Sequence, residues 1–329
     1  EYPNFGTAYV GRAKAHLEKD DCESAQRDLA IIQYNNGLEG ISEAEREKAQ
    51  KLLEDLDCSS NPTYWIVSVG ISQYQNLEGL SNVDVQARDF AYYYVDAKLT
   101  HKKIGPTILQ NREAKKAKIL DAIRMTFLRE NNPYLKDNDV IVFFFSGHGK
   151  KAYQDGPIGD LLPWEFDIED NNPSTWIKNL DILKIMDQSP VKNKVCIIEA
   201  CKTDITTAGL PNIGMSPRDR SFIDDWFESL DQKENWVYLT STLQDKVSLN
   251  HKIYGGLFSY CLLNGLKQGA ADGFLGIGED YKDGVVTIEE LKAYVETNLK
   301  GLSNKINLKT QVPVLEGDPD RRFPMYFYN

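Results

Sequence analysis

Five short runs of β-branched and aromatic residues are apolar on both faces and alternate with helical stretches, and this alternation limits the fold more than any other feature. The runs cover residues 63–71, 107–110, 139–147, 194–200 and 235–242. The helical stretches lie near residues 83–99, 114–130, 179–188 and 256–267. Strands that bury both faces belong to parallel sheets that carry helices on each side, joined by right-handed crossovers. The pattern therefore predicts an α/β domain with a doubly wound, mostly parallel sheet.

Residues 1–58 carry helical periodicity and no strand pattern, so we expect a small all-α segment ahead of the sheet. Ser42 and Glu45 have the spacing of a capping box at the start of one helix. The segment resembles one tetratricopeptide repeat with a trailing helix, with Ala13 and Leu29 at packing positions. A single repeat cannot bury its own apolar face, so we expect it to pack on the following domain, on further repeats or on a protein partner. The alternative is a helical cap without a binding role.

The turn-rich sequence at residues 58–63 marks a linker, which makes residues 63–329 the second domain. Lys and Arg total 38 against 49 Asp and Glu, and the net charge of −11 argues against a nucleic-acid partner. No apolar run approaches the about 18 residues of a membrane-spanning helix, so no membrane partner is expected. The 5 cysteines are odd in number and widely spread. They fit reduced thiols better than a disulfide framework, so we expect a cytoplasmic protein.

His148 stands between two glycines at the end of the apolar run 139–147. In open α/β sheets the reactive crevice lies beyond the carboxyl ends of the strands, where this residue is predicted to be. The flanking glycines would let the chain turn sharply off the strand and let a substrate approach the main chain. The alternative is a structural histidine held by a carbonyl group, which would not need that clearance.

Cys201 follows the next predicted strand, one loop and one crossover helix after His148. Neighbouring strands lie about 4.8 Å apart, so the imidazole and the thiol come within reach of each other if these two strands are adjacent. An imidazole can then lower the pKa of the thiol or accept its proton during nucleophilic attack. The main-chain N–H groups of Gly149 and Cys201 are the expected oxyanion donors. Cys196 faces the other side of the same strand and is expected to be a buried structural thiol.

The motifs SGHG (146–149) and EAC (199–201) resemble those of caspase-like cysteine peptidases, on the bacterial branch near the metacaspases and orthocaspases. The resemblance runs from residue 63 to residue 329. It implies a caspase-like fold and a cysteine endopeptidase that acts on protein or peptide substrates, with His148 as general base and Cys201 as nucleophile. The alternative is a catalytically silent scaffold with the same fold. The presence of both dyad residues favours the enzyme.

The resemblance implies no cofactor, and the sequence predicts no metal site, because the histidines lack partners at metal-ligand spacing. The Asp-rich stretch 155–170 is similar to a region that binds calcium in some metacaspases, but we favour a solvated loop. Residues 279–290 have the glycine and the final glutamate of a calcium loop without its first ligands. A helix start with Thr287 and Glu290 as a capping box explains that stretch better.

The specificity of the predicted peptidase depends on acidic residues near the dyad. In metacaspase-like members an Asp at the start of the first helix lines a pocket for Arg or Lys, whereas Gln86 stands there in this chain and Asp84 lies two residues earlier. Leu80 occupies the place of the Arg that binds aspartate in caspases, which argues against cleavage after Asp. Glu199 is predicted to share a strand face with Cys201, and its charge favours Arg or Lys at P1. The alternative for Glu199 is a carboxylate held by neighbouring N–H groups.

The long segment after Cys201 carries Arg218 and Arg220 in a setting rich in Gly and Pro. Proteolytic nicking concentrates in exposed loops of this kind. The related peptidases process themselves in this region, so the resemblance implies self-cleavage after one of these arginines. Regulation through the N-terminal helices is a further expectation from the repeat-like segment.

Overall fold

A computed structural model of the chain falls into two compact units, Glu1–Pro62 and Thr63–Asn329. The structure describes residues 10–14, 29, 32, 42–55, 62–101, 104–151, 159–167, 175–200, 235–241, 248–274, 284–306, 308, 311–317 and 324–327. Cys201, Arg218 and Arg220 lie outside these residues. None of the helices in the described part is both long and apolar enough to cross a membrane.

The first unit contains the helix α3 (Glu43–Asp55). The predicted capping box at its start is confirmed, because the Glu45 carboxylate accepts from the Ser42 N–H at 2.9 Å and the Ser42 hydroxyl accepts from the Glu45 N–H at 3.3 Å. A small apolar cluster joins Ala49 of this helix to four earlier residues, Val10, Ala13, Leu29 and Ile32. The likeness to a tetratricopeptide repeat stays a prediction.

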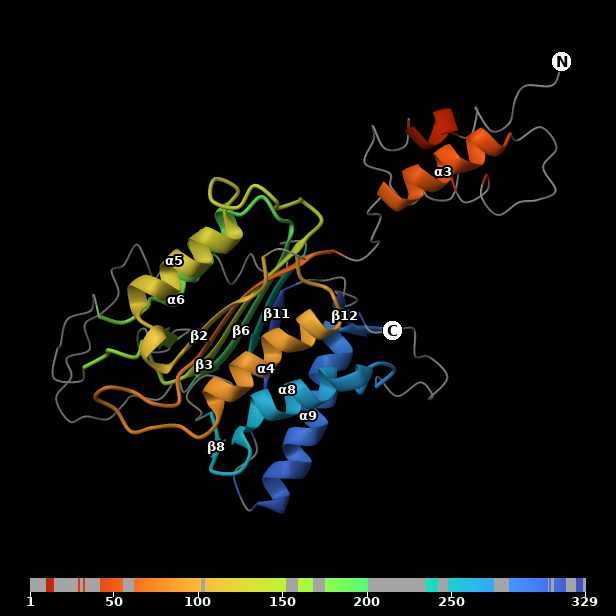
Figure 1. Cartoon of the computed structure of the whole chain (residues 1–329). Helices are drawn as coiled ribbons and strands as arrows, with labels where there is room; N and C mark the ends of the chain where they lie inside the picture. The colour runs from red at the N-terminus through yellow and green to blue at the C-terminus, as the bar shows by residue number, and fades with distance from the viewer. Residues whose placement is uncertain are drawn as a thin grey trace. The chain divides into compact units, whose positions relative to one another are not determined.

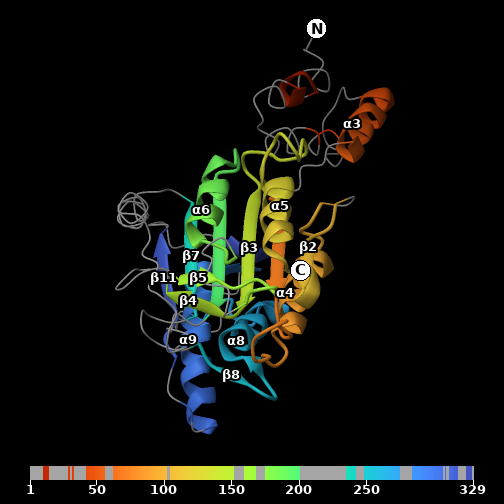
Figure 2. The same cartoon turned by 90° about the vertical axis from the view of Figure 1, so that its left-hand side faces the viewer.

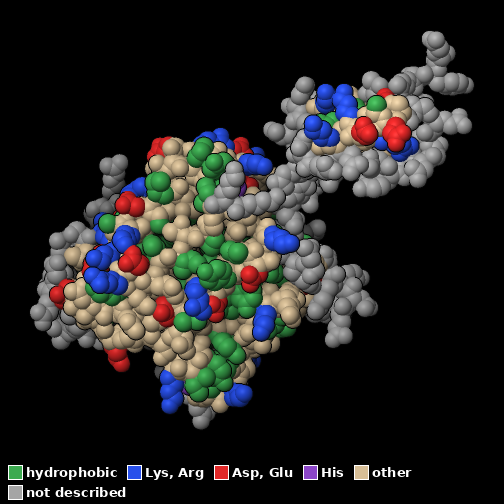
Figure 3. Space-filling view, in the orientation of Figure 1, with side chains coloured by type: hydrophobic (Ala, Val, Ile, Leu, Met, Phe, Trp, Pro, Cys, Tyr) green, Lys and Arg blue, Asp and Glu red, His purple; other side chains and the backbone are tan. Residues whose placement is uncertain are grey.

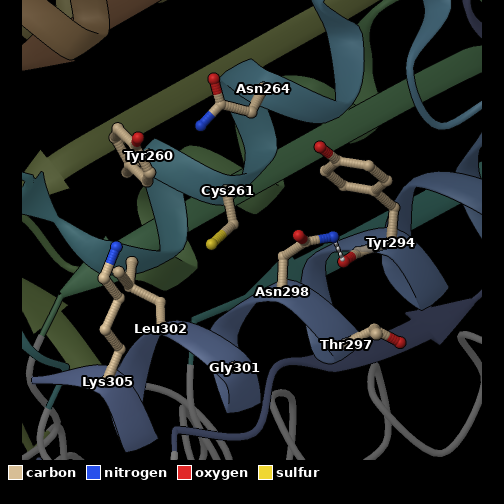
Figure 4. A pocket seen from close by; sticks show the side chains of 9 residues that line it. All are labelled: Tyr260, Cys261, Asn264, Tyr294, Thr297, Asn298, Gly301, Leu302 and Lys305. Carbon is tan, nitrogen blue, oxygen red and sulfur yellow. Dashed lines mark hydrogen bonds between the residues drawn. The ribbon is translucent and has the colours of Figure 1, made fainter.

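The second unit is built on a six-stranded sheet in the order β11-β7-β6-β3-β1-β2 (Figures 1 and 2). Its strands are β1 (Tyr64–Gly70), β2 (Thr107–Gln110), β3 (Val140–Gly147), β6 (Asn193–Ala200), β7 (Trp236–Thr240) and β11 (Val314–Gly317). All neighbouring pairs are parallel except β11 with β7, which is antiparallel. The prediction of a mostly parallel sheet is confirmed, although the sequence pattern does not predict β11.

Helices cover both faces of the sheet, as the apolar strands require (Figure 1). They are α4 (Val83–Asp96), α5 (Lys116–Phe127), α6 (Asn179–Gln188), α8 (Leu257–Leu266) and α9 (Ile288–Lys305). Two short 3-10 helices, η1 (Asn111–Glu113) and η3 (Lys267–Gly269), accompany them. In the part of the chain that the structure describes, α5 and α6 share one apolar core with the sheet, and α4, α8 and α9 share the core on its other face.

Alternate residues of β3 show how one strand serves both cores. Phe143 and Phe145 belong to the core beneath α5 and α6, whereas Phe144 belongs to the other. The ring of Phe144 stacks on that of Phe90 in α4, with centroids 4.5 Å apart. Burying one such side chain contributes about 2 kcal/mol, so the strand that leads to His148 is held firmly from both sides.

Three pairs of short antiparallel strands complete the described elements. They are β4 (Gly149–Lys151) with β5 (Gly159–Leu161), β8 (Asn250–His251) with β9 (Gly255–Gly256), and β10 (Val285–Thr287) with β12 (Pro324–Phe327). The predicted capping box of Thr287 and Glu290 is confirmed at the start of α9. The first two hairpins matter for function, because both border the end of β3.

Candidate active site

The ends of β3 and β6 are level with each other at the edge of the sheet where His148 lies. The two strands pair in parallel, with Ser146 opposite Glu199 and Gly147 opposite Ala200. The two strands are therefore adjacent, which meets the condition on which the predicted approach of the imidazole and the thiol depends. His148 is the next residue after Gly147, and position 201 is the next after Ala200, although Cys201 itself lies outside the described residues. Cys196 is buried and faces the core beneath α5 and α6, as predicted.

The imidazole of His148 is held by a main-chain carbonyl. Its Nε2 lies 2.9 Å from the carbonyl oxygen of Glu78. A carbonyl oxygen can only accept, so Nε2 carries the hydrogen and Nδ1 keeps a free lone pair. Burial lowers the pKa of His148, and the Glu78 carbonyl and carboxylate oppose this effect only in part. The ring is therefore neutral at neutral pH and can accept a proton at Nδ1.

The two glycines beside His148 do not need the left-handed backbone that favours glycine. Neither Gly147 nor Gly149 has a positive φ, and only His148 separates β3 from β4. Space explains Gly147 instead. A Cβ atom at this position would lie 2.6 Å from the hydroxyl oxygen of Tyr74, closer than such atoms can approach. A glycine at position 147 thus leaves room for the Tyr74 hydroxyl of this chain, whereas the sequence analysis expects that room to serve a substrate.

The N–H of Gly149 points away from the neighbouring strand. Gly149 lies opposite Leu161 in the β4–β5 hairpin. Leu161 exchanges both of its main-chain hydrogen bonds with Ile177 on its other side, each at 2.9 Å. Since antiparallel pairs alternate between bonded and non-bonded, the pair of Gly149 and Leu161 is a non-bonded one. The Gly149 N–H is therefore directed outward beside His148, where it could donate a hydrogen bond to a substrate oxygen.

Glu199 is buried with 3% of its surface exposed, and its carboxylate accepts from four donors. Two donors are main-chain N–H groups in the first turn of α8, those of Phe258 at 3.0 Å and Ser259 at 3.4 Å. The others are the hydroxyls of Ser146, at 2.9 Å, and Ser259. The carboxylate thus caps α8, whose own N-cap is Gly256. Burial raises the pKa of Glu199, and these hydrogen bonds oppose the rise.

A pocket beside His148 brings several of these groups together. Glu199 lies at this pocket with the imidazole, and Leu80, Val83 and Leu249 supply apolar side chains to its wall. Its lining residues are Leu80, Val83, Ser146, Gly147, His148, Glu199, Ser248, Leu249, Asn250 and Gly256. The structure therefore places the predicted base and the predicted specificity carboxylate at one cavity.

Gln86 and Asp84 are not among the lining residues of that pocket. The Gln86 amide donates to the carbonyls of Tyr254 and Gly256, at 2.9 and 3.0 Å, and accepts from the Gly256 N–H at 2.9 Å. It therefore fixes the β8–β9 hairpin.

Asp84 instead fixes the start of the loop that follows β1. Its carboxylate accepts from the Ser72 hydroxyl at 2.5 Å and from the Asn111 amide at 2.8 Å. Burial raises the pKa of Asp84, but these hydrogen bonds, together with those from the main-chain N–H groups of Val85 and Asp84 itself, outweigh it and hold the pKa below its ordinary value. The carboxylate is therefore ionised at neutral pH and already paired.

Three groups at the site carry no signal in the sequence that would single them out. They are the Tyr74 hydroxyl, the Glu78 carbonyl and Asn250, whose amide exchanges two hydrogen bonds with the main chain of Ser81 at 2.9 and 3.0 Å. Each of these groups contacts a residue far away in the sequence, and such contacts cannot be predicted from periodicity or motif spacing. In the described ranges, no group of three or more His, Cys, Asp or Glu side chains is arranged to hold a metal ion.

Comparison with known proteins gives one family and one fold. Residues 63–324 match the family model described as "Caspase domain", Peptidase_C14. The structure is similar to the crystal structure of caspase-1 from Spodoptera frugiperda, with 15% identity and a TM-score of 0.51, over 80% of this chain and 89% of that one. At this identity the likeness concerns the fold alone. No curated protein sequence matches the chain significantly.

Proposed function

The chain belongs to the caspase domain family of cysteine peptidases, and from this premise we propose that it is a cysteine endopeptidase with a His148/Cys201 dyad. The observation that carries the proposal is the register of β3 and β6, in which Gly147 and Ala200, the residues just before the dyad members, are partners. Two side chains that leave adjacent parallel strands at the same level emerge within reach of one bound peptide.

In the proposed reaction, Nδ1 of His148 takes the proton of the Cys201 thiol as the sulfur attacks the carbonyl carbon of the scissile bond. The resulting tetrahedral intermediate expels the amine, which receives the proton from Nδ1. Water then hydrolyses the thioester, with Nδ1 again as the base. The Glu78 carbonyl supports this role, because it holds the tautomer in which Nδ1 is the basic nitrogen.

The negative charge of the intermediate needs hydrogen-bond donors aimed at the oxygen on which it develops. We propose the N–H groups of Gly149 and Cys201 for this task. The outward direction of the Gly149 N–H supports its part. One such donor contributes about 3 kcal/mol to stabilisation of the transition state.

We propose a basic P1 residue, Arg or Lys, as in metacaspase-like members of the family. Glu199 supports this preference, because it is a buried carboxylate at the pocket beside His148 and forms no salt bridge with any described residue. A P1 cation would supply the missing counter-charge in a pocket of low dielectric constant. Asp84 and Gln86 would shape this pocket indirectly, through the loop and the hairpin that they hold.

A panel of peptides with Arg, Lys, Asp or Leu at P1 tests the proposed function, with the C201A variant as the control. We expect cleavage after Arg and Lys by the native chain and none by C201A. The assay should include a calcium series, because some metacaspases bind this ion. Failure to cleave any peptide under all these conditions would favour the scaffold instead.

Self-cleavage after Arg218 or Arg220 is a second expected activity, and intact mass spectrometry measures it directly. The native chain should give two fragments whose masses sum to that of the intact chain plus one water molecule, whereas C201A should remain whole. A combined R218A/R220A substitution should prevent that cut while the native chain still processes. Uncleaved native protein that turns over peptides would show that activation does not need this cut.

The N-terminal unit is proposed to bind a protein partner or further repeats rather than substrate. Its described core is small, which supports a need for additional apolar contacts.

A further inference from the structure

The β4–β5 hairpin beside His148 begins with an irregular pair. By the register of the hairpin, His148 lies opposite Leu162, and the Leu162 N–H donates to the His148 carbonyl at 3.0 Å. In a regular bonded pair the His148 N–H would donate back to the Leu162 carbonyl. It donates instead to the hydroxyl of Tyr74 at 2.6 Å, and that hydroxyl lies 3.4 Å from the Leu162 carbonyl oxygen. The tyrosine hydroxyl is thus inserted into the ladder and relays the missing bond.

The same tyrosine also covers the imidazole. The ring centroids of Tyr74 and His148 are 4.8 Å apart, with an interplanar angle of 47°. Tyr74 is itself held by packing against the apolar cluster of Leu162, Phe166 and Trp176 and against the core beneath α5 and α6. Its ring therefore has a fixed place from which it can limit the tilt of the imidazole.

Tyr74 and the carbonyl of Glu78 belong to one loop that is fastened at both ends. The loop is closed by a hydrogen bond from the Leu80 N–H to the Ser72 carbonyl at 2.8 Å. Asn111 holds its start and Asn250 holds the residue after its end. This loop therefore contacts His148 at the ring face, at Nε2 and at the main-chain N–H.

Building on the proposed function, we propose that Tyr74 is a positioning residue: its hydroxyl sets the main chain of His148 and its ring sets the plane of the imidazole. Gly147 makes this role possible, because a side chain at position 147 would displace the Tyr74 hydroxyl. Without the hydroxyl, the His148 N–H would bond directly to Leu162. That closure would draw His148 toward β5 and pull Nε2 away from the Glu78 carbonyl.

Steady-state kinetics of the Y74F variant test this role. Since a misplacement of about 1 Å can cost up to about 10²-fold in rate, we expect kcat to fall by about tenfold or more, with KM within about twofold of native. Y92F is the matched control, because Tyr92 is 48% exposed on α4 and should tolerate loss of its hydroxyl. An unchanged kcat for Y74F would overturn the proposal.

A double-mutant cycle of Y74F and G147A tests whether Gly147 acts by leaving room for the Tyr74 hydroxyl. G147A alone should lower kcat at least as much as Y74F, since its methyl group displaces the hydroxyl. In the Y74F background the same substitution should cost less, because the most severe clash is already absent and only the tight contact with the Phe145 ring, at 3.0 Å, remains. Additive effects in a Y74F/G147A double variant would contradict the proposed relationship.

NMR of histidine labelled with ¹⁵N separates this proposal from the proposed function, because it needs no turnover. Native His148 should show the Nε2–H tautomer, and Y74F should show a mixture of tautomers while its melting temperature stays near native. An unaltered tautomer in both Y74F and G147A would overturn the positioning role. Inactivity of the native protein would instead contradict the peptidase proposal. The NMR spectra would still test the role of Tyr74 in that case.

Discussion

The H148A variant is expected to lose at least about 10³-fold in kcat/KM toward any peptide that the native chain cleaves, because one residue acts as base and then as acid. H101A is a matched control. His101 stacks on Trp65, near the opposite end of the sheet, with ring centroids 5.2 Å apart. A native rate in H148A would exclude the dyad, and an equal loss in H101A would show that the effect is structural.

The same histidine predicts the acidic limb of the pH profile of the proposed peptidase activity. The base must be neutral to act, so activity is lost as pH falls through the pKa of His148 in the folded protein. Burial lowers this pKa, so half-maximal kcat/KM should lie below the ordinary histidine value of about 6.5.

The E199Q variant is expected to lose about 10²-fold in kcat/KM for peptides with Arg or Lys at P1, while a Leu peptide changes little. This loss corresponds to about 3 kcal/mol for the removed charge. The fold should survive, because the hydroxyls of Ser146 and Ser259 can rotate to accept from the new amide, and its oxygen can still cap α8. E290Q is the matched control, since Glu290 caps α9 away from the pocket.

The comparison between Arg and Leu peptides separates two roles of Glu199. If its only role is to cap α8, E199Q will lower the rates of both peptides together or lower the melting temperature alone. An unchanged ratio of Arg to Leu cleavage would therefore end the proposal of a charge-based P1 preference.

Much of the fold was accessible from the sequence because strands buried on both faces have a distinctive composition. The apolar run before His148 and the run before position 201 each predicted a buried strand, and the structure shows that the two strands are adjacent. Both capping boxes were also predictable, since each joins residues only three apart. Interactions between residues so close in the chain can be predicted directly from the sequence. The edge strand β11 has a mixed, half-buried face and gives no such signal.

The surroundings of the site were less predictable because they depend on contacts between distant segments. The sequence shows a glutamate at the end of a strand, but not that its four donors would come from β3 and from α8. It also offers no reason for a glycine at position 256, where a Cβ atom would overlap the Glu199 carboxylate. For Gly147 the sequence did not show the reason that the structure gives, which is space for the Tyr74 hydroxyl.

The hydrogen bond from His148 Nε2 to the Glu78 carbonyl depends on the main chain at position 78 and not on its side chain. Every amino acid offers the same main-chain carbonyl, so substitutions at position 78 would leave the tautomer of the histidine intact. The distance along the loop matters instead, since Leu80 and Ser72 close it. Substitution of residue 78 should therefore keep this hydrogen bond and change only the effect of the Glu78 charge on the pKa of His148, whereas insertion or deletion of one residue in the loop should remove the bond.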